Sequence, residues 1–312
     1  MQNPINLSEV NLVFATPRNP PRGRNLPGRV VILDLAFASN AVKNGFERIT
    51  LPLIKELGLR LAAWVDHHDH DEHARFQSDP RFVLHSKSDH GACPELITPD
   101  LVRKFAPVNT IVCHTDFDGL ASAAKWIRNG LEPYEGCDDD ARAIDTRLGR
   151  PSATADTIDR ALRARPSDNA LFGLVVRHLA SGLKDPSLWV PIREAAEQLR
   201  AIEVETRKLA LAYARLAPGV AFVDVSHRRT RIDKTLLLLT GQEMEPIAMV
   251  VDKETINLAA RFDGGVNLLK LLGLSGGMPT RVSVSRDRLA ETCAALGVER
   301  SAVEGILDRR KQ

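Results

Sequence analysis

Three short apolar runs in the first half of the chain each end in an acidic or a histidine residue. The runs are Arg29–Asp34, Arg60–Asp66 and Asn109–His114. Between them, Phe46–Leu57 and Pro94–Phe105 have the apolar spacing of helices. This alternation of strands and helices predicts an α/β domain with a mostly parallel sheet, in which the polar strand ends meet at one edge.

The second half predicts a smaller α/β domain behind a helical linker. Residues 155–216 have helical composition and spacing, and Pro218-Gly219 marks the end of that stretch. Further strands are expected at 220–225, 248–251, 255–260 and 281–284, with a helix at 267–272. We therefore expect a first domain over residues 1–190, a linker over 191–218 and a second domain over 219–312.

Composition excludes several classes of protein. Lys and Arg number 42 against 40 Asp and Glu, and a formal charge of +2 argues against binding long duplexes through bulk charge. The four cysteines lack C-x-x-C spacing, which predicts free thiols rather than a zinc knuckle or a disulfide framework. No apolar run approaches the roughly 20 residues of a membrane helix, and the first residues lack a signal-peptide pattern, so we expect a cytoplasmic protein with no membrane partner.

Histidine and aspartate gather at the predicted strand ends. Seven of the nine histidines lie between positions 67 and 114. Asp66-His67-His68 follows one strand, His114-x-Asp116-x-Asp118-Gly119 follows another, and Asp34 ends a third. Each alone has a simpler interpretation, such as a helix cap for Asp34 or a solvated loop for the histidines. Their coincidence at three strand ends favours a divalent metal site, and hard oxygen donors favour Mn²⁺ or Mg²⁺.

The two motifs together resemble those of the DHH phosphoesterase family, which includes RecJ-type exonucleases, phosphodiesterases of short oligonucleotides and cyclic dinucleotides, and family II pyrophosphatases. The resemblance spans most of the chain. It extends to Ala92-Cys-Pro-Glu95 and Ala143-Ile-Asp145-Thr146 in the first half, and to Asn257–Arg261, Gly265-Val-Asn-Leu and Ser275–Pro279 in the second. The first domain would thus be catalytic and the second a divergent DHH-associated substrate domain.

The chain departs from the family pattern in two places. In the family, His-x-Asp-x-Asp comes first, then the strand-end aspartate, then the DHH triplet. Here the order is Asp34, Asp66-His67-His68, then His114-x-Asp116-x-Asp118, as in a circular permutation. Met278 stands where the substrate domain of the family has a histidine that contacts phosphate, and methionine cannot donate to phosphate.

The resemblance implies a centre of two metal ions bridged by Asp34. His114 and Asp116 would hold one ion, and His67, Asp118 and Asp145 the other. His68 would face the substrate phosphate, with Asp66 orienting the triplet as its catalytic partner. The substrate-binding residues would be Arg261, Gly276, Gly277 and Arg281, because turn N–H groups and guanidinium groups bind anions.

The implied activity is that of a Mn²⁺-dependent phosphoesterase with two ions, Mg²⁺ being the alternative metal. The ions would activate water for in-line attack on a phosphodiester in a short oligonucleotide, a dinucleotide or a similar nucleotide. Two alternatives stay open: an inorganic pyrophosphatase or polyphosphatase, and a non-catalytic nucleotide-binding relative. Asp308-Arg-Arg-Lys-Gln312 is similar to the Ser-Arg-Lys-Lys-Gln motif of the pyrophosphatases. A homodimer is also compatible with the sequence.

Overall fold

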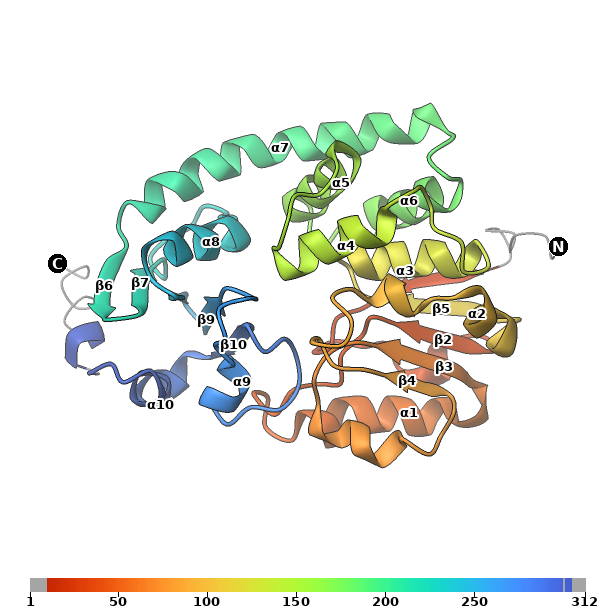
Figure 1. Cartoon of the computed structure of the whole chain (residues 1–312), viewed down its shortest axis with the longest axis horizontal. Coiled ribbons are helices and arrows are strands. Elements are labelled where there is room, and N and C mark those ends of the chain that lie inside the picture. The colour runs from red at the N-terminus through yellow and green to blue at the C-terminus, as the bar shows by residue number, and fades with distance from the viewer. Residues whose placement is uncertain (1–9, 300, 305–312) are drawn as a thin grey trace. The chain divides into compact units, whose positions relative to one another are not determined.

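The computed structural model of the chain (Figure 1) describes residues 10–299 and 301–304. Its contacts divide the chain into two compact units, and each is described by itself. Of the described residues, unit 1 holds those up to Asn40 together with Asn44–Leu199, and unit 2 holds Ala41–Lys43 together with those from Arg200 onward. Asp308–Gln312, with its similarity to the pyrophosphatase motif, lies outside the described residues.

Among the described residues, unit 1 contains a five-stranded sheet in the order β1-β5-β2-β3-β4, with every pair of neighbours parallel. The strands are β1 (Asn11–Phe14), β2 (Val30–Leu33), β3 (Leu61–Asp66), β4 (Phe82–Leu84) and β5 (Thr110–Cys113). The middle strand, β2, pairs with β5 on one side and β3 on the other. All the carboxyl ends of these strands therefore lie along the same edge of the sheet.

Both faces of this sheet are covered, as expected for a parallel sheet. Side chains of β2 alternate: Val30 and Ile32 join one buried apolar cluster, and Val31 and Leu33 join another. Figure 1 shows α1 (Leu51–Leu57) on one face and α3 (Phe117–Ile127) on the other. Trp64 anchors the α1 face, where its Nε1 donates a hydrogen bond to the Leu35 carbonyl oxygen over 2.9 Å.

The remaining helices of unit 1 complete these layers. The longer ones are α2 (Pro99–Phe105), α4 (Cys137–Thr146), α5 (Ala153–Ala164), α6 (Asn169–Ala180) and α7 (Pro186–Ala210). The short ones are η1 (Gly23–Asn25), η2 (Phe46–Thr50), η3 (Gly58–Arg60), η4 (Asp71–Phe76) and η5 (Cys93–Leu96). The boundary between the units falls inside α7. None of the helices in the described ranges is long and apolar enough to cross a membrane.

The described part of unit 2 contains a mixed five-stranded sheet in the order β10-β9-β8-β7-β6, in which only β7 and β8 run parallel. Its strands are β6 (Ala214–Ala217), β7 (Val220–Asp224), β8 (Ile247–Val251), β9 (Thr255–Ala260) and β10 (Arg281–Ser285). Its helices are α8 (Lys234–Met244), α9 (Leu268–Leu271), η6 (Arg286–Arg288) and α10 (Leu289–Ala295). Leu237 and Leu238 of α8 pack on one face of the sheet, and Leu268 and Leu269 of α9 on the other.

These two sheets confirm the predicted fold class: a mostly parallel α/β domain and a smaller α/β domain, with helices between them in the chain. The domain bounds at 190 and 218 stay a prediction. Two details of the helix prediction are wrong. The helix expected to reach Leu216 ends at Ala210, because Ala214–Ala217 pairs with β7 as an edge strand. The helix expected over Pro94–Phe105 is interrupted, because Thr98 caps a new helix that begins at Pro99.

Candidate metal centre

Three neighbouring strands of unit 1 deliver the predicted metal ligands to one edge of the sheet. Asp34 follows β2, Asp66 ends β3 and His114 follows β5. Backbone hydrogen bonds continue the sheet past the strand ends: Asp34 N–H donates to the Val65 carbonyl over 2.8 Å, and His114 N–H to that of Leu33 over 3.3 Å. Asp34, at the end of the central strand, is thus held between the ends of the two flanking strands.

A tight turn after β5 adds two further carboxylates at the start of α3. Asp116 is the N-cap of α3, and its side chain accepts a hydrogen bond from Gly119 N–H over 3.4 Å. Asp118 lies in the first turn and is buried. A side chain at Gly119 would put its Cβ 2.7 Å from the His114 carbonyl oxygen, so the turn requires glycine there.

Asp34 is the most constrained residue of the site. It is 1% exposed and has a φ of 56°, in the left-handed region that few residues other than glycine and asparagine adopt. Within the described residues, neither of its carboxylate oxygens accepts a hydrogen bond. Burial, followed by the charges of Asp118, Asp116 and Asp66, raises its pKa well above the usual value. The site therefore holds a buried acid that lacks sufficient positive charge around it.

His114 and Asp116 form a first group of candidate ligands with Asp34. His114 Nδ1 lies 2.8 Å from Asp116 Oδ2 and 3.8 Å from Asp34 Oδ2. Burial alone would lower the pKa of His114, but the charge and hydrogen bond of Asp116 raise it overall. The side chains of His114 and Asp116 are 23% and 45% exposed, so solvent reaches this group while Asp34 stays buried.

His67, Asp118 and Asp145 form a second group. His67 Nε2 lies 3.3 Å from Asp118 Oδ2 and 3.6 Å from Asp145 Oδ2, and also 3.2 Å from Asp34 Oδ1. The other ring nitrogen, Nδ1, donates to the His90 carbonyl oxygen over 2.8 Å, which leaves a lone pair on Nε2. Burial would raise the pKa of Asp118, but the neighbouring His67 and Lys87 lower it overall.

Asp66 and His68 lie beside these groups as a hydrogen-bonded pair. His68 Nδ1 donates to Asp66 Oδ1 over 2.8 Å, and 16% of the His68 side chain is exposed. Burial would raise the pKa of Asp66, but the charge and hydrogen bond of His68 lower it. Burial lowers the pKa of His68, against the opposing charge of Asp66. The geometry is that of an aspartate that orients an imidazole.

The chemistry of the donors fits a divalent cation at the first group. Asp34, His114 and Asp116 each offer a ligand atom within 4.8 Å of the others, and carboxylates with an imidazole suit Mn²⁺ or Mg²⁺. The Asp34 carboxylate is buried and accepts no hydrogen bond within the described residues, which independently favours a cation there.

One residue of the centre was not predicted from the sequence. Lys87 lies in the loop after β4, is 1% exposed, and places its Nζ 2.9 Å from His67 Nε2 and in an ion pair with Asp145. Its neighbours in sequence, Ser86 and Ser88, are ordinary loop residues, and a single lysine in a loop has no periodicity that could reveal its burial.

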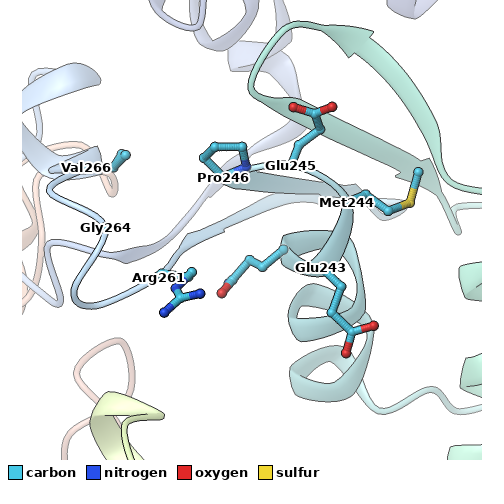
Figure 2. Close-up of a pocket in the computed structure, with 8 residues that line it drawn as sticks. Glu243, Met244, Glu245, Pro246, Arg261, Gly264 and Val266 are labelled. Atoms are coloured by element: carbon cyan, nitrogen blue, oxygen red, sulfur yellow. The ribbon is translucent and has the colours of Figure 1, made fainter.

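The substrate-binding residues predicted in the second half all belong to unit 2, and the structure brings them near the β9–β10 pair. Ala260 N–H donates to the Thr280 carbonyl, which places Arg261 and Arg281 beside these linked residues. The guanidinium of Arg261 pairs with Asp263 and lines a pocket of about 270 Å³ with the end of α8 (Figure 2). Gly276 and Gly277 have φ values of 96° and 117°, so the turn before β10 needs glycine.

Comparison with known proteins gives little further guidance. No protein-family model and no curated protein sequence matches the chain. A similar solved structure is that of a pGpG-specific phosphodiesterase, PggH from Vibrio cholerae, with 11% sequence identity and a TM-score of 0.41. That similarity covers 88% of this chain and 100% of the other. A likeness of this size does not bear on function, which rests on the residues of the centre.

Proposed function

We propose that this chain is a metal-dependent phosphoesterase that hydrolyses a phosphodiester in a short oligonucleotide, a dinucleotide or a similar nucleotide. The observation that carries the proposal is Asp34, a buried carboxylate without a hydrogen-bond donor that lies between two groups of histidine and aspartate. An uncompensated buried charge costs several kcal/mol, so cations beside such a cluster stabilise it.

Asp34, His114 and Asp116 would hold a divalent ion, with Mn²⁺ as the expected metal and Mg²⁺ as the alternative. His67, Asp118 and Asp145 form a second cation position. A bound ion of this kind stabilises charge on a phosphoryl oxygen and lowers the pKa of water.

The chain itself supplies the proton acceptor. Because His68 Nδ1 donates to Asp66, the other ring nitrogen, Nε2, carries a lone pair that can accept a proton on the substrate side. Burial lowers the pKa of His68, which favours the neutral ring that this role requires. Asp66 fixes the orientation and tautomer of the ring.

In unit 2, Arg261, Arg281 and the Gly276-Gly277 turn would bind a phosphate of the substrate. The exposed Arg261 guanidinium lies at a pocket, and the backbone N–H groups of a turn such as Gly276-Gly277 can bind an anion. The near-neutral charge of the chain favours a small substrate over a long duplex.

A substrate panel tests the proposal. The metal-stripped chain is assayed with and without Mn²⁺ on a linear dinucleotide, a cyclic dinucleotide, a short oligonucleotide and inorganic pyrophosphate. We expect Mn²⁺-dependent hydrolysis of a phosphodiester. Faster cleavage of pyrophosphate would identify a pyrophosphatase, and nucleotide binding without any hydrolysis would identify a non-catalytic relative.

Two matched substitutions locate the activity. Asp116→Asn is expected to lower the rate by more than the roughly 10–100-fold typical of residues that only support metal ligands. Asp139→Asn removes a carboxylate whose side chain is 79% exposed in the same unit, and should leave the rate unchanged. Full activity in Asp116→Asn would refute the assigned site.

A further inference from the structure

Lys87 is a buried lysine whose charged end lies inside the candidate metal centre. None of its side-chain surface is exposed, and its Nζ donates to His67 Nε2 over 2.9 Å and pairs with Asp145. Moving an ammonium group out of water costs several kcal/mol, so it persists only where carboxylates compensate it. Lys87 is compensated by the acids that would otherwise hold a metal ion.

The contacts of Lys87 compete directly with a metal ion at the second group. An ion held by His67, Asp118 and Asp145 needs the lone pair on His67 Nε2 and the Oδ2 atom of Asp145. Lys87 engages both of these atoms. The hydrogen bond from His67 Nδ1 to the His90 carbonyl fixes the tautomer that lets Nε2 accept from the ammonium.

The first group has no such competitor. Within the described residues, every ion pair of Asp34 and Asp116 involves a histidine, and none involves lysine or arginine. The side chains of His114 and Asp116 are also partly open to solvent, which gives an ion a route to this group. The two groups are therefore unequal: Lys87 contacts His67 and Asp145 in the second group and forms no ion pair with the carboxylates of the first.

We infer that the Lys87 ammonium occupies the second cation position, so that the native chain binds one divalent ion, at Asp34, His114 and Asp116. This inference rests on the proposed function and departs from the two-ion centre that the sequence resemblance implies. A lysine ammonium is a compact point charge that cannot be lost by chelation, so one of the three positive charges of the centre would be permanent.

The number of bound ions tests this inference. Metal-stripped protein is dialysed against excess Mn²⁺, and bound Mn²⁺ is counted by elemental mass spectrometry, with electron paramagnetic resonance reporting whether two ions are coupled. We expect one uncoupled Mn²⁺ in the native chain and two coupled ions in Lys87→Met. Lys87→Arg keeps the charge and should bind one.

A second buried lysine provides the matched control. Lys125 of α3 is also buried, donates to the Pro94 carbonyl oxygen over 2.9 Å and pairs with Asp138, outside the ligand groups. Lys125→Met should still bind one Mn²⁺. A change from one to two bound ions in Lys87→Met, without the same change in Lys125→Met, would show that the effect is specific to Lys87 and does not follow from removing any buried lysine.

The possible counts separate the two proposals. Two ions in the native chain would overturn the role of Lys87 and leave the proposed function standing. No bound ion would refute the proposed function, and the inference with it. One ion in both the native chain and folded Lys87→Met would show that Lys87 does not occupy a metal position. If Lys87→Met does not fold, the native count still decides.

Discussion

Replacing Asp34 by asparagine should make the metal-free protein more stable and at the same time abolish its response to metal. Asparagine keeps the size of the side chain and tolerates the φ of 56° that this position requires. It removes a buried charge whose oxygens accept no hydrogen bond within the described residues. Because the amide is neutral, its desolvation costs less than that of the charged carboxylate, and we expect a gain of about 1–3 kcal/mol.

The pH dependence of this effect follows from the raised pKa of Asp34. A carboxyl whose folded pKa lies above its ordinary value of 3.8 contributes its full stability below that value, and the contribution is lost as the pH rises through the folded pKa. The advantage of Asp34→Asn in the metal-free state should therefore grow with pH. For a unit of this size, each kcal/mol corresponds to about 2–4 °C in melting temperature.

Mn²⁺ is expected to reverse which of the two proteins, the native chain or Asp34→Asn, is the more stable. Mn²⁺ at about 100 times its Kd stabilises a protein that binds it by about 2.7 kcal/mol, and Asp34→Asn should gain almost none of this. Thermal unfolding at pH 5 and pH 8, with chelator or with Mn²⁺, measures both effects. A variant less stable than the native chain in chelator, or one stabilised equally by Mn²⁺, would refute the reasoning.

Three further predictions address other parts of the chain. Burial lowers the pKa of His73 to about 4, so its contribution to stability is present above its ordinary pKa of 6.5 and is lost as the pH falls towards 4. In urea titrations, His73→Phe should therefore lose up to about 3 kcal/mol less stability than the native chain over this pH range. An unchanged dependence of stability on pH in the variant would contradict this. Gly119→Ala should lower the free energy of unfolding by about 1–3 kcal/mol and weaken Mn²⁺ binding in calorimetry, because its Cβ would meet the His114 carbonyl. Gly173→Ala should be tolerated, because a Cβ there has no neighbour nearer than 3.9 Å. Equal behaviour of the two variants would contradict the account. Arg261→Gln should raise KM roughly 10–100-fold and leave Mn²⁺ affinity unchanged, since a charge-assisted hydrogen bond contributes about 1.5–3 kcal/mol. An unchanged KM would show that Arg261 does not bind the substrate.

Much of the fold could be predicted because its strands are strongly patterned. The runs that end at Asp34, Asp66 and His114 are buried strands with side chains on two apolar clusters, and their order in the sheet places the polar ends together. The edge strands β1 and β4 were not predicted; unlike β2 and β5, whose residues are all buried, they are only partly buried. At Leu216 the helical composition of the preceding residues was misleading, since pairing with β7 outweighs local propensity.

The candidate site shows a similar division. The structure gathers Asp34, His67, Asp118 and Asp145 around one point, although Asp145 follows no predicted strand and came only from the family resemblance. Lys87 could not be predicted, because its burial depends on how the loop after β4 folds back beneath His67. Long-range placement of this kind is decided by tertiary packing, which leaves no local pattern in the sequence.

The central claim is that Asp34, His114 and Asp116 bind a divalent ion. Crystals grown with Mn²⁺ and measured near the manganese absorption edge would locate the ion directly by anomalous scattering. The account predicts a peak within bonding distance of all three side chains that is absent from Asp34→Asn crystals. A peak elsewhere, or none at saturating Mn²⁺, would contradict it.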